Sequence, residues 1–345
     1  MIVSEEIHNL IEKETSSFKS FFTPEYLLRN YKYGPSDIII VFDKGRIGIA
    51  GNEKLYREKM IVNVRANMIG KIINDAWHKY PEIINDFKLV VPFCFSDKSD
   101  FPIQSIPCLS FSKAEFSNNI VVPSIDNYCM MEPTFLQRVD QFDIPLSQKE
   151  NRMCFFGSWT GNVGDQIADN PRLLLAAKAA NSDNIVCRMS RPPMFPEDSF
   201  LKSIQKANEL YPELNNEIIL NTEQGVGIQE QLKYKYQLCV DGHTSAWSRL
   251  PWQMYSNSLP IKVRNRRTSW REWFYPLLDF SKHCIEADID DLEEVYELLE
   301  NNKQLQEDII YTGKQFVQKY WNKNLAMDVL VHTLYLLNKI QNNRI

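Results

Sequence analysis

The sequence lacks the features that mark membrane, metal and disulfide-stapled proteins. No uncharged apolar run approaches the ~18 residues that a membrane-spanning helix requires. The seven cysteines are an odd number without any CxxC pair, and the five histidines never take HExxH or another metal-ligand spacing. These absences favour reduced thiols in the core over disulfides or a zinc site.

Charge of either sign is not concentrated anywhere along the chain. The 39 Lys and Arg and the 44 Asp and Glu give a formal net charge of −5 and are scattered without long blocks. We therefore expect no nucleic-acid partner and no general anionic-membrane surface, although local basic sites fit the pattern. The stretch MIVSEEIHNLIEKETSSF is charged early and lacks the apolar core of a signal peptide, so we expect a cytoplasmic protein.

Strand-like and helix-like segments alternate along the chain, without internal repeats. The hydrophobic pattern predicts strands at 37–42, 48–50, 87–93, 107–111, 153–156, 184–189, 217–220 and 236–240. It predicts helices at 55–80, 171–180, 290–301 and 327–341, with irregular structure from 112 to 148.

This alternation is typical of parallel α/β layers, and it restarts after the polar segment 148–152. A chain of 345 residues also exceeds what one hydrophobic core usually holds. We predict an α/β protein with two Rossmann-like domains, residues 1–150 and 151–325. The final helix, in 326–345, is expected to pack back on the N-terminal domain.

Three polar loops follow predicted strands, where parallel sheets bind their ligands. The first holds Gly157, Ser158 and Thr160, whose glycine and hydroxyls suit a phosphate. The second holds Asp241, Gly242, His243 and Ser245, with Arg249 shortly beyond it. The third, 96–100, carries carboxylates. Together they suggest a nucleotide donor that faces a base across a cleft.

Ordinary structural roles stand beside these functional ones. Asp100 can cap a turn, the hydroxyls in 157–161 can bond turn amides, and Arg249 can be an ion-pair partner. His243 is more often a loop hydrogen-bonder than a catalyst. Trp247 and Trp252 are most simply core residues, with uridine stacking as the alternative.

Two further patterns are set aside. Asp288-Ile289-Asp290 resembles a metal-binding Asp-x-Asp motif, but it precedes a helix start, where acidic residues suit the helix terminus. Gly225-Val226-Gly227 lacks the third glycine of a dinucleotide-binding loop.

Several blocks of the sequence resemble one known family. YKYQLCVDGHTSAWSRLPWQMYSNSLPIK at 234–262, followed by WREWFYPLL at 270–278, is similar to the CAP10 domain of glycosyltransferase family 90. SDFP at 99–102 resembles the family's Asp-Tyr-Pro loop, FSK at 111–113 the Phe-Ser-Lys after it, and FGS at 156–158 its Phe-Arg-Gly-Ser turn. The family includes Rumi protein O-glucosyltransferases, fungal capsule xylosyltransferases and bacterial lipopolysaccharide-modifying enzymes.

The resemblance implies a GT-B fold and inverting transfer from a UDP-sugar without a metal or other cofactor. By position, Asp100 matches the family's catalytic base, and Ser158 and Arg249 match its donor-binding serine and arginine. The chain departs from the family at Phe156, where an arginine is common, and again near 164–165, where a second arginine is expected. Arg172 supplies that charge only by a shifted alignment.

The expected chemistry is removal of an acceptor hydroxyl proton by Asp100 while arginine and serine stabilise the departing diphosphate. The predicted donor-binding set is Gly157, Ser158, Thr160, Arg172, Asp241, Gly242, His243, Ser245, Arg249 and Glu272, where Glu272 either contacts the ribose or pairs with a nearby arginine. No metal ligand is predicted.

The expected donors are UDP-glucose, UDP-xylose and UDP-galactose, which the sequence does not distinguish. The expected acceptor is a glycan such as a lipopolysaccharide core or capsule precursor, and a lipid-linked acceptor would bring peripheral membrane association. One alternative is a sugar-nucleotide-binding protein that has lost catalysis, which the Phe156 departure permits. Another is an NAD-dependent oxidoreductase, disfavoured because no Gly-x-Gly-x-x-Gly turn follows the first strand.

Overall fold

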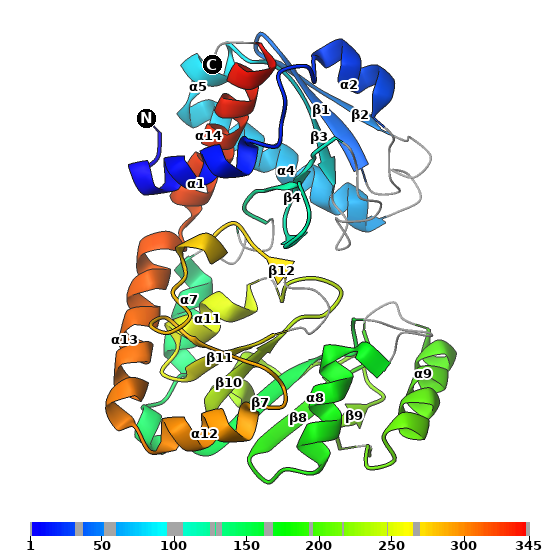
Figure 1. Ribbon diagram of the computed structural model, residues 1–345, viewed down its shortest axis with the longest axis vertical. Helices are drawn as coiled ribbons and strands as arrows, with labels where there is room; N and C mark the ends of the chain where they lie inside the picture. The colour runs from blue at the N-terminus through cyan, green and yellow to red at the C-terminus, as the bar shows by residue number, and fades with distance from the viewer. Residues whose placement is uncertain are drawn as a thin grey trace. The chain divides into compact units, whose positions relative to one another are not determined.

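Two separate β-sheets organise the chain (Figure 1). The computed structural model describes residues 2–31, 37–51, 60–94, 106–124, 128, 133–161, 168–192, 196–215, 217–246, 248–264 and 270–342. The chain divides into a first unit, Met1–Cys129 with Trp270–Pro276 and Asn322–Ile345, and a second unit, Met130–Ser269 with Leu277–Trp321.

The sheet of the first unit is mixed. Its strand order is β2-β1-β3-β4-β6, formed by Arg46–Gly51, Asp37–Asp43, Lys88–Cys94, Leu109–Ser110 and Ile120–Val121. β1 runs antiparallel to both β2 and β3, whereas β3, β4 and β6 are parallel. Lys44 and Gly45 join β1 to β2 with positive φ angles of 45° and 79°. Such a two-residue turn forces an antiparallel hairpin, as the apolar runs 37–42 and 48–50 on either side of a turn at 43–45 predict.

Helices α1 (Glu5–Thr15), α2 (Pro24–Asn30), α4 (Met60–Lys79), α5 (Pro81–Ile84) and α14 (Lys323–Gln341) complete the first unit. The C-terminal helix α14 packs against α1, α4 and β3. Its Asn338 and Gln341 side chains accept hydrogen bonds from the Lys88 and Val90 amides of β3, at 2.9 and 2.8 Å. The helix therefore satisfies backbone groups that would otherwise remain open on this strand.

A two-stranded ribbon brings a distant segment into the first unit. β12 (Trp270–Arg271) pairs antiparallel with β5 (Lys113–Ala114).

The boundary between the two units falls between residues 129 and 130, earlier in the chain than the boundary at residue 150 that we expected. Helix α7 (Pro133–Phe142), in a region that we predicted to be irregular, packs against α10 (Ile228–Gln231) and α11 (Arg249–Tyr255) of the second unit.

The sheet of the second unit is parallel throughout. Its order is β13-β11-β10-β7-β8-β9, formed by Ile285–Ala287, Leu259–Val263, Tyr234–Val240, Glu150–Ser158, Ile185–Ser190 and Ile219–Leu220. From β7 the chain builds outward through β8 and β9, and from β10 it builds the opposite way through β11 and β13. The topological switch point of this doubly wound sheet therefore lies between β7 and β10.

The helices of the second unit cover its sheet on both faces. They are α7, α8 (Pro171–Ala180), α9 (Glu197–Leu210), α10 (Ile228–Gln231), α11 (Arg249–Tyr255), α12 (Leu292–Glu300) and α13 (Lys303–Tyr320), with 3-10 turns at Leu146–Gln148 (η1) and Tyr275–Leu277 (η3). Residues of α8, α9 and α12 join Met153 and Phe155 in the large core. Alternate β7 residues, Cys154 and Phe156, form a separate cluster with Tyr234.

β7 begins at Glu150, inside the segment that we predicted to be a polar break. Glu150 is exposed, but its backbone amide donates to the Lys233 carbonyl, so strand pairing overrides the polar composition. The six cysteines of the described ranges are buried and form no disulfide with one another, as their sequence context predicts.

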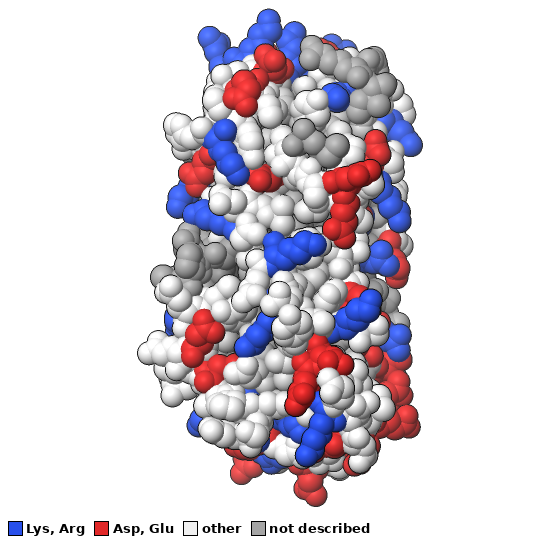
Figure 2. All heavy atoms as spheres, turned by 90° about the vertical axis from the view of Figure 1, so that its left-hand side faces the viewer, with Lys and Arg blue, Asp and Glu red and all other residues white. Residues whose placement is uncertain are grey.

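The surface agrees with the dispersed charge of the sequence. On the face shown in Figure 2, Lys and Arg side chains are interspersed with Asp and Glu side chains, and neither sign forms a continuous patch. Within the described ranges, no helix is both long and apolar enough to cross a bilayer. The same ranges hold no group of three or more His, Cys, Asp or Glu side chains placed to bind a metal.

Candidate functional site

The loops after β7 and β10 meet at the switch point of the second sheet. Two of the three predicted polar loops, 157–161 and 241–245, lie here, at the carboxyl ends of adjacent parallel strands. One hydrogen bond links the two loops: the Gly161 backbone amide donates to His243 Nδ1 at 3.3 Å. Parallel α/β sheets bind their ligands at this position.

Close packing against Phe155 demands glycine at the end of β7. A Cβ on Gly157 would lie 2.8 Å from Cζ of the Phe155 ring, a distance that real Cβ atoms do not adopt. The same ring lies 5.4 Å from the guanidinium carbon of Arg172 and 5.2 Å from that of Arg249, measured to the ring centroid. One aromatic ring therefore supports two cations at the switch point.

Arg172 fastens the two strand ends together. It lies in the first turn of α8 and is buried, and its guanidinium donates to the carbonyls of Ser158 (2.7 Å), Val240 (3.2 Å) and Asp241 (3.2 Å). A further N–H donates to Thr160 Oγ1 at 2.6 Å. Four of the five guanidinium N–H groups are thus used within the protein. Burial, with the charge of Arg249, lowers the pKa of Arg172 to about 10.

Arg249 is held at only two of its N–H groups. Nη1 donates to Gln231 Oε1 at 3.1 Å and Nη2 to the Phe156 carbonyl at 2.8 Å. The other three N–H groups have no acceptor among the residues that the structure describes. Burial lowers the pKa of Arg249 from its ordinary value, but a guanidinium remains charged at neutral pH. Arg249 is therefore oriented by the protein and still able to donate to an anion.

Phe156 contributes its backbone carbonyl, and not its side chain, to the site around Arg249. Its ring is buried against Tyr234, with centroids 5.5 Å apart, while its carbonyl holds Arg249.

The loop after β10 begins with a buried ion pair. Asp241 Oδ1 accepts from Lys262 Nζ at 2.5 Å and from the Ala246 amide at 3.1 Å, and both charged side chains are almost fully buried. Separating the pair would leave a buried charge without a partner, which costs free energy. The pair therefore holds the loop 241–246 in place. The Asp241 carboxylate thus has a structural role that the sequence did not predict.

Gly242 allows the two loops to touch. A Cβ at this position would lie 2.4 Å from Thr160 Oγ1 and 3.0 Å from Arg172 Nη2. Any larger residue must push the loops apart or displace the arginine. The neighbouring Ser245 is buried and His243 is half-buried.

Asn170 links the first loop to helix α8. Its Oδ1 accepts from the Arg172 and Leu173 amides, which caps the helix, and its Nδ2 donates to the Thr160 carbonyl at 3.2 Å. Gly161 has a φ of +120° and would bring a Cβ within 2.9 Å of the Asn170 side chain. Glycine is required here on both counts.

The site has an excess of positive charge. Among the site residues that the structure describes, Arg172, Arg249 and Lys262 supply three cations and Asp241 supplies one carboxylate. The Ser158 hydroxyl, at the end of β7, has no hydrogen-bond partner among the described residues. Unused guanidinium donors beside a hydroxyl at a parallel-sheet switch point suit a phosphate or diphosphate.

Nine of the predicted residues come together in the second unit. Gly157, Ser158, Thr160, Arg172, Asp241, Gly242, His243, Ser245 and Arg249 share one edge of the second sheet. Glu272 is buried in the first unit, next to β12. Asp100, its neighbour Asp97 and Trp247 lie outside the described residues. The Asp288 carboxylate binds Arg264 at 2.9 Å rather than capping α12.

Sequence reasoning missed three supporting residues. Lys262 had a visible signal, because it is a lone charge in the otherwise apolar strand β11. Asn170 had one too, since Asn followed by Pro is a common helix start. Gln231 had none, because only the tertiary fold brings it to Arg249.

The site and the doubly wound sheet define an α/β protein suited to an anionic ligand, and comparison with known families is more specific. The family model described as Glycosyl transferase family 90 matches residues 46–342. The chain therefore belongs to glycosyl transferase family 90.

Individual relatives are more distant. Uncharacterized protein 179R of Invertebrate iridescent virus 6 is 29% identical over 115 residues, which cover 32% of this chain and 10% of that protein. The chain thus spans about a tenth of the length of this curated relative.

Two solved structures are among those to which the chain shows a low similarity. A glycosyltransferase from Rickettsia africae ESF-5 has a TM-score of 0.40 at 9% identity, covering 71% of this chain and 66% of that one. Anabaena Alr3699/HepE, solved in complex with UDP-glucose, has a TM-score of 0.35 at 11% identity, covering 59% of this chain and 53% of that one.

Proposed function

We propose that the protein transfers a sugar from a UDP-sugar to a hydroxyl of a glycan, with inversion and without a metal. Membership of glycosyl transferase family 90 supports sugar transfer. The single observation that carries the donor side is Arg249, oriented by Gln231 and the Phe156 carbonyl with three N–H groups left to donate. A GT-B arrangement of the two units remains part of this proposal.

On the donor side, the diphosphate would lie across the carboxyl ends of β7 and β10. Arg249 and the Ser158 hydroxyl would donate to its oxygens, and these donors strengthen as the leaving diphosphate gains charge. Because the guanidinium is already oriented, little reorganisation accompanies the reaction. Arg172 acts differently: its contacts with the strand-end carbonyls make it a residue that shapes the site.

On the acceptor side, the base is Asp100, proposed from its match to the family's Asp-Tyr-Pro loop. A carboxylate within hydrogen-bond reach would take the hydroxyl proton while the oxygen attacks the anomeric carbon opposite UDP. We propose glucose, xylose or galactose as the sugar and a lipopolysaccharide core or capsule precursor as the acceptor. A lipid-linked acceptor would place the protein at a membrane surface from the cytoplasmic side.

A panel of ligands tests this function. UDP and UDP-sugars should raise the melting temperature of the full chain and NAD should not, because only a ligand of the folded state stabilises it. Radiolabelled UDP-glucose, UDP-xylose and UDP-galactose then report transfer or slow hydrolysis. Stabilisation by UDP without either reaction would favour the non-catalytic sugar-nucleotide-binding protein. Stabilisation by NAD alone would refute the proposal.

A further inference from the structure

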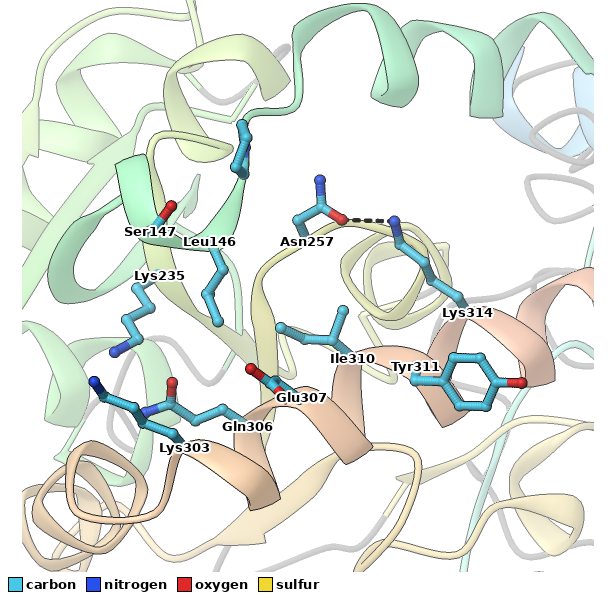
Figure 3. A pocket seen from close by; sticks show the side chains of 11 residues that line it. Leu146, Ser147, Lys235, Asn257, Lys303, Gln306, Glu307, Ile310, Tyr311 and Lys314 are labelled. Carbon is cyan, nitrogen blue, oxygen red and sulfur yellow. Dashed lines mark hydrogen bonds between the residues drawn. The ribbon is translucent and has the colours of Figure 1, made fainter.

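A pocket of about 770 Å³ opens on the second unit, away from the candidate donor site (Figure 3). Its lining comes from η1, from α13 and from the residues at or before the starts of β10 and β11. It therefore lies at the amino-terminal edge of the parallel strands, whereas the donor loops follow their carboxyl ends. The seven residues of β10 separate the two edges by roughly 20 Å at about 3.3 Å per residue.

An amide side chain held by the protein faces this pocket. Gln306 is only 3% exposed, and its Nε2 donates to the Leu299 carbonyl at 2.5 Å and to the Tyr236 hydroxyl at 3.3 Å. These bonds orient the amide, so that Oε1 is the atom on the pocket side. Oε1 accepts no hydrogen bond from any residue that the structure describes. This oxygen is therefore open to a donor from a bound molecule.

The charged side chains of the lining are only partly neutralised. Lys235 pairs with Glu300 at 2.5 Å. Lys314 is half-buried and donates to Asn257 Oδ1 at 2.7 Å, and Lys303 is exposed. Neither Lys303 nor Lys314 has a carboxylate within 4.0 Å in the described part of the chain. Glu307, between them on α13, likewise has no cation within that distance, so two cations and one carboxylate remain for a ligand.

An aromatic ring stands beside these groups. Tyr311 is 66% exposed and lines the pocket one helical turn from Glu307. Figure 3 shows Glu307, Tyr311 and Lys314 along one side of α13. A flat ring next to a carboxylate and amide groups matches a sugar, whose apolar face stacks on an aromatic while its hydroxyls donate to oxygen acceptors.

We propose that this pocket binds a glycan segment that carries a negatively charged group, a carboxylate or a phosphate. A sugar ring lies on Tyr311, and its hydroxyls donate to Gln306 Oε1 and to Glu307. The anionic group lies between Lys303 and Lys314. Because this edge is far from the donor loops, the pocket holds no reacting hydroxyl, and its ligand binds with or without a donor.

Saturation-transfer NMR on the full chain tests the site with three probes: cellotetraose, which is neutral, a hyaluronan tetrasaccharide, which carries carboxylates, and glucose 6-phosphate. Comparing the two anionic probes shows whether the pocket takes a carboxylate or a phosphate. At least one should bind about tenfold more tightly than cellotetraose, as one added hydrogen bond between charged groups implies. Saturating UDP should not displace it.

Two variants locate the binding. Lys314→Met should remove the preference for the anionic probe, and Tyr311→Ala should weaken the hyaluronan tetrasaccharide and cellotetraose alike. Lys202→Met, an exposed lysine on α9, is the matched control and should change neither. Thermal unfolding of each variant establishes that it is folded.

Three results would overturn the proposal. One is binding of no probe at concentrations up to about 10 mM. Another is displacement of the probes by UDP, which would assign them to the donor site. The third is an anionic preference that survives Lys314→Met. A chain that fails to bind UDP but retains this probe binding would refute only the proposed transfer function.

Discussion

Replacing Arg249 with alanine should weaken UDP binding roughly 10- to 150-fold. Among the described residues, Gln231 and the Phe156 carbonyl occupy only two N–H groups of this guanidinium, which leaves three for a ligand. A hydrogen bond to a charged group contributes about 1.5–3 kcal/mol, and each 1.4 kcal/mol is a factor of about ten in affinity. The range assumes that one such bond to the diphosphate is lost and not replaced.

A second variant separates orientation from charge. Gln231→Met keeps the arginine but removes the acceptor of its Nη1 donor, so the guanidinium is less firmly held. We expect a loss of UDP affinity of about fivefold, near 1 kcal/mol, which is smaller than that of Arg249→Ala. In the double variant the second change should add little, because Gln231 acts through Arg249.

Isothermal titration with UDP measures each affinity, and thermal unfolding shows whether each variant is folded. Arg249→Lys, which keeps the charge but not the forked donors, should fall between wild type and alanine. Folded Arg249→Ala that binds UDP within about threefold of wild type would refute the assignment of this residue to the diphosphate.

Four other predictions concern the base, the metal, the loop contact and pH. Asp100→Asn should reduce transfer by about 10²–10⁴-fold with UDP affinity nearly unchanged, and Asp97→Asn should do much less; the reverse order of effects would reassign the base. Transfer should persist in excess EDTA, and loss that manganese restores would contradict a metal-free site. Gly242→Ala should lower the free energy of unfolding, measured by urea titration, by about 1–3 kcal/mol, because its Cβ meets Thr160 Oγ1 at 2.4 Å. The control Gly227→Ala should leave this free energy nearly unchanged, because a Cβ there has open space around it. Burial lowers the pKa of His332 to about 4, so below its ordinary value of 6.5 the unfolded chain binds more protons. Stability should therefore fall as pH drops from 6.5 toward 4, by roughly 2 kcal/mol at pH 5, and His332→Gln should flatten this dependence.

Much of the fold could be predicted because local pattern and local structure agree. The apolar runs at β1, β3 and β10 are strands within a residue or two of their expected ends, and helix α8 begins at Pro171 as its Asn-Pro signal indicates. The prediction failed at α7 and at the start of β7. Both are stabilised by partners distant in sequence: α10 and α11 for the helix, β10 for the strand.

The loops of the candidate site were visible in the sequence because glycines, hydroxyls and an arginine after apolar strands form a short-range pattern. Their meeting at one point was not, because it depends on the order β8-β7-β10-β11, which no local pattern specifies. The two arginines show the difference. In the sequence, each is an arginine near the start of a helix, and nothing local distinguishes them. In the structure, strand-end carbonyls surround Arg172, whereas Arg249 keeps N–H groups without an acceptor among the described residues. The difference arises because α8 and α11 approach the switch point from different places in the fold.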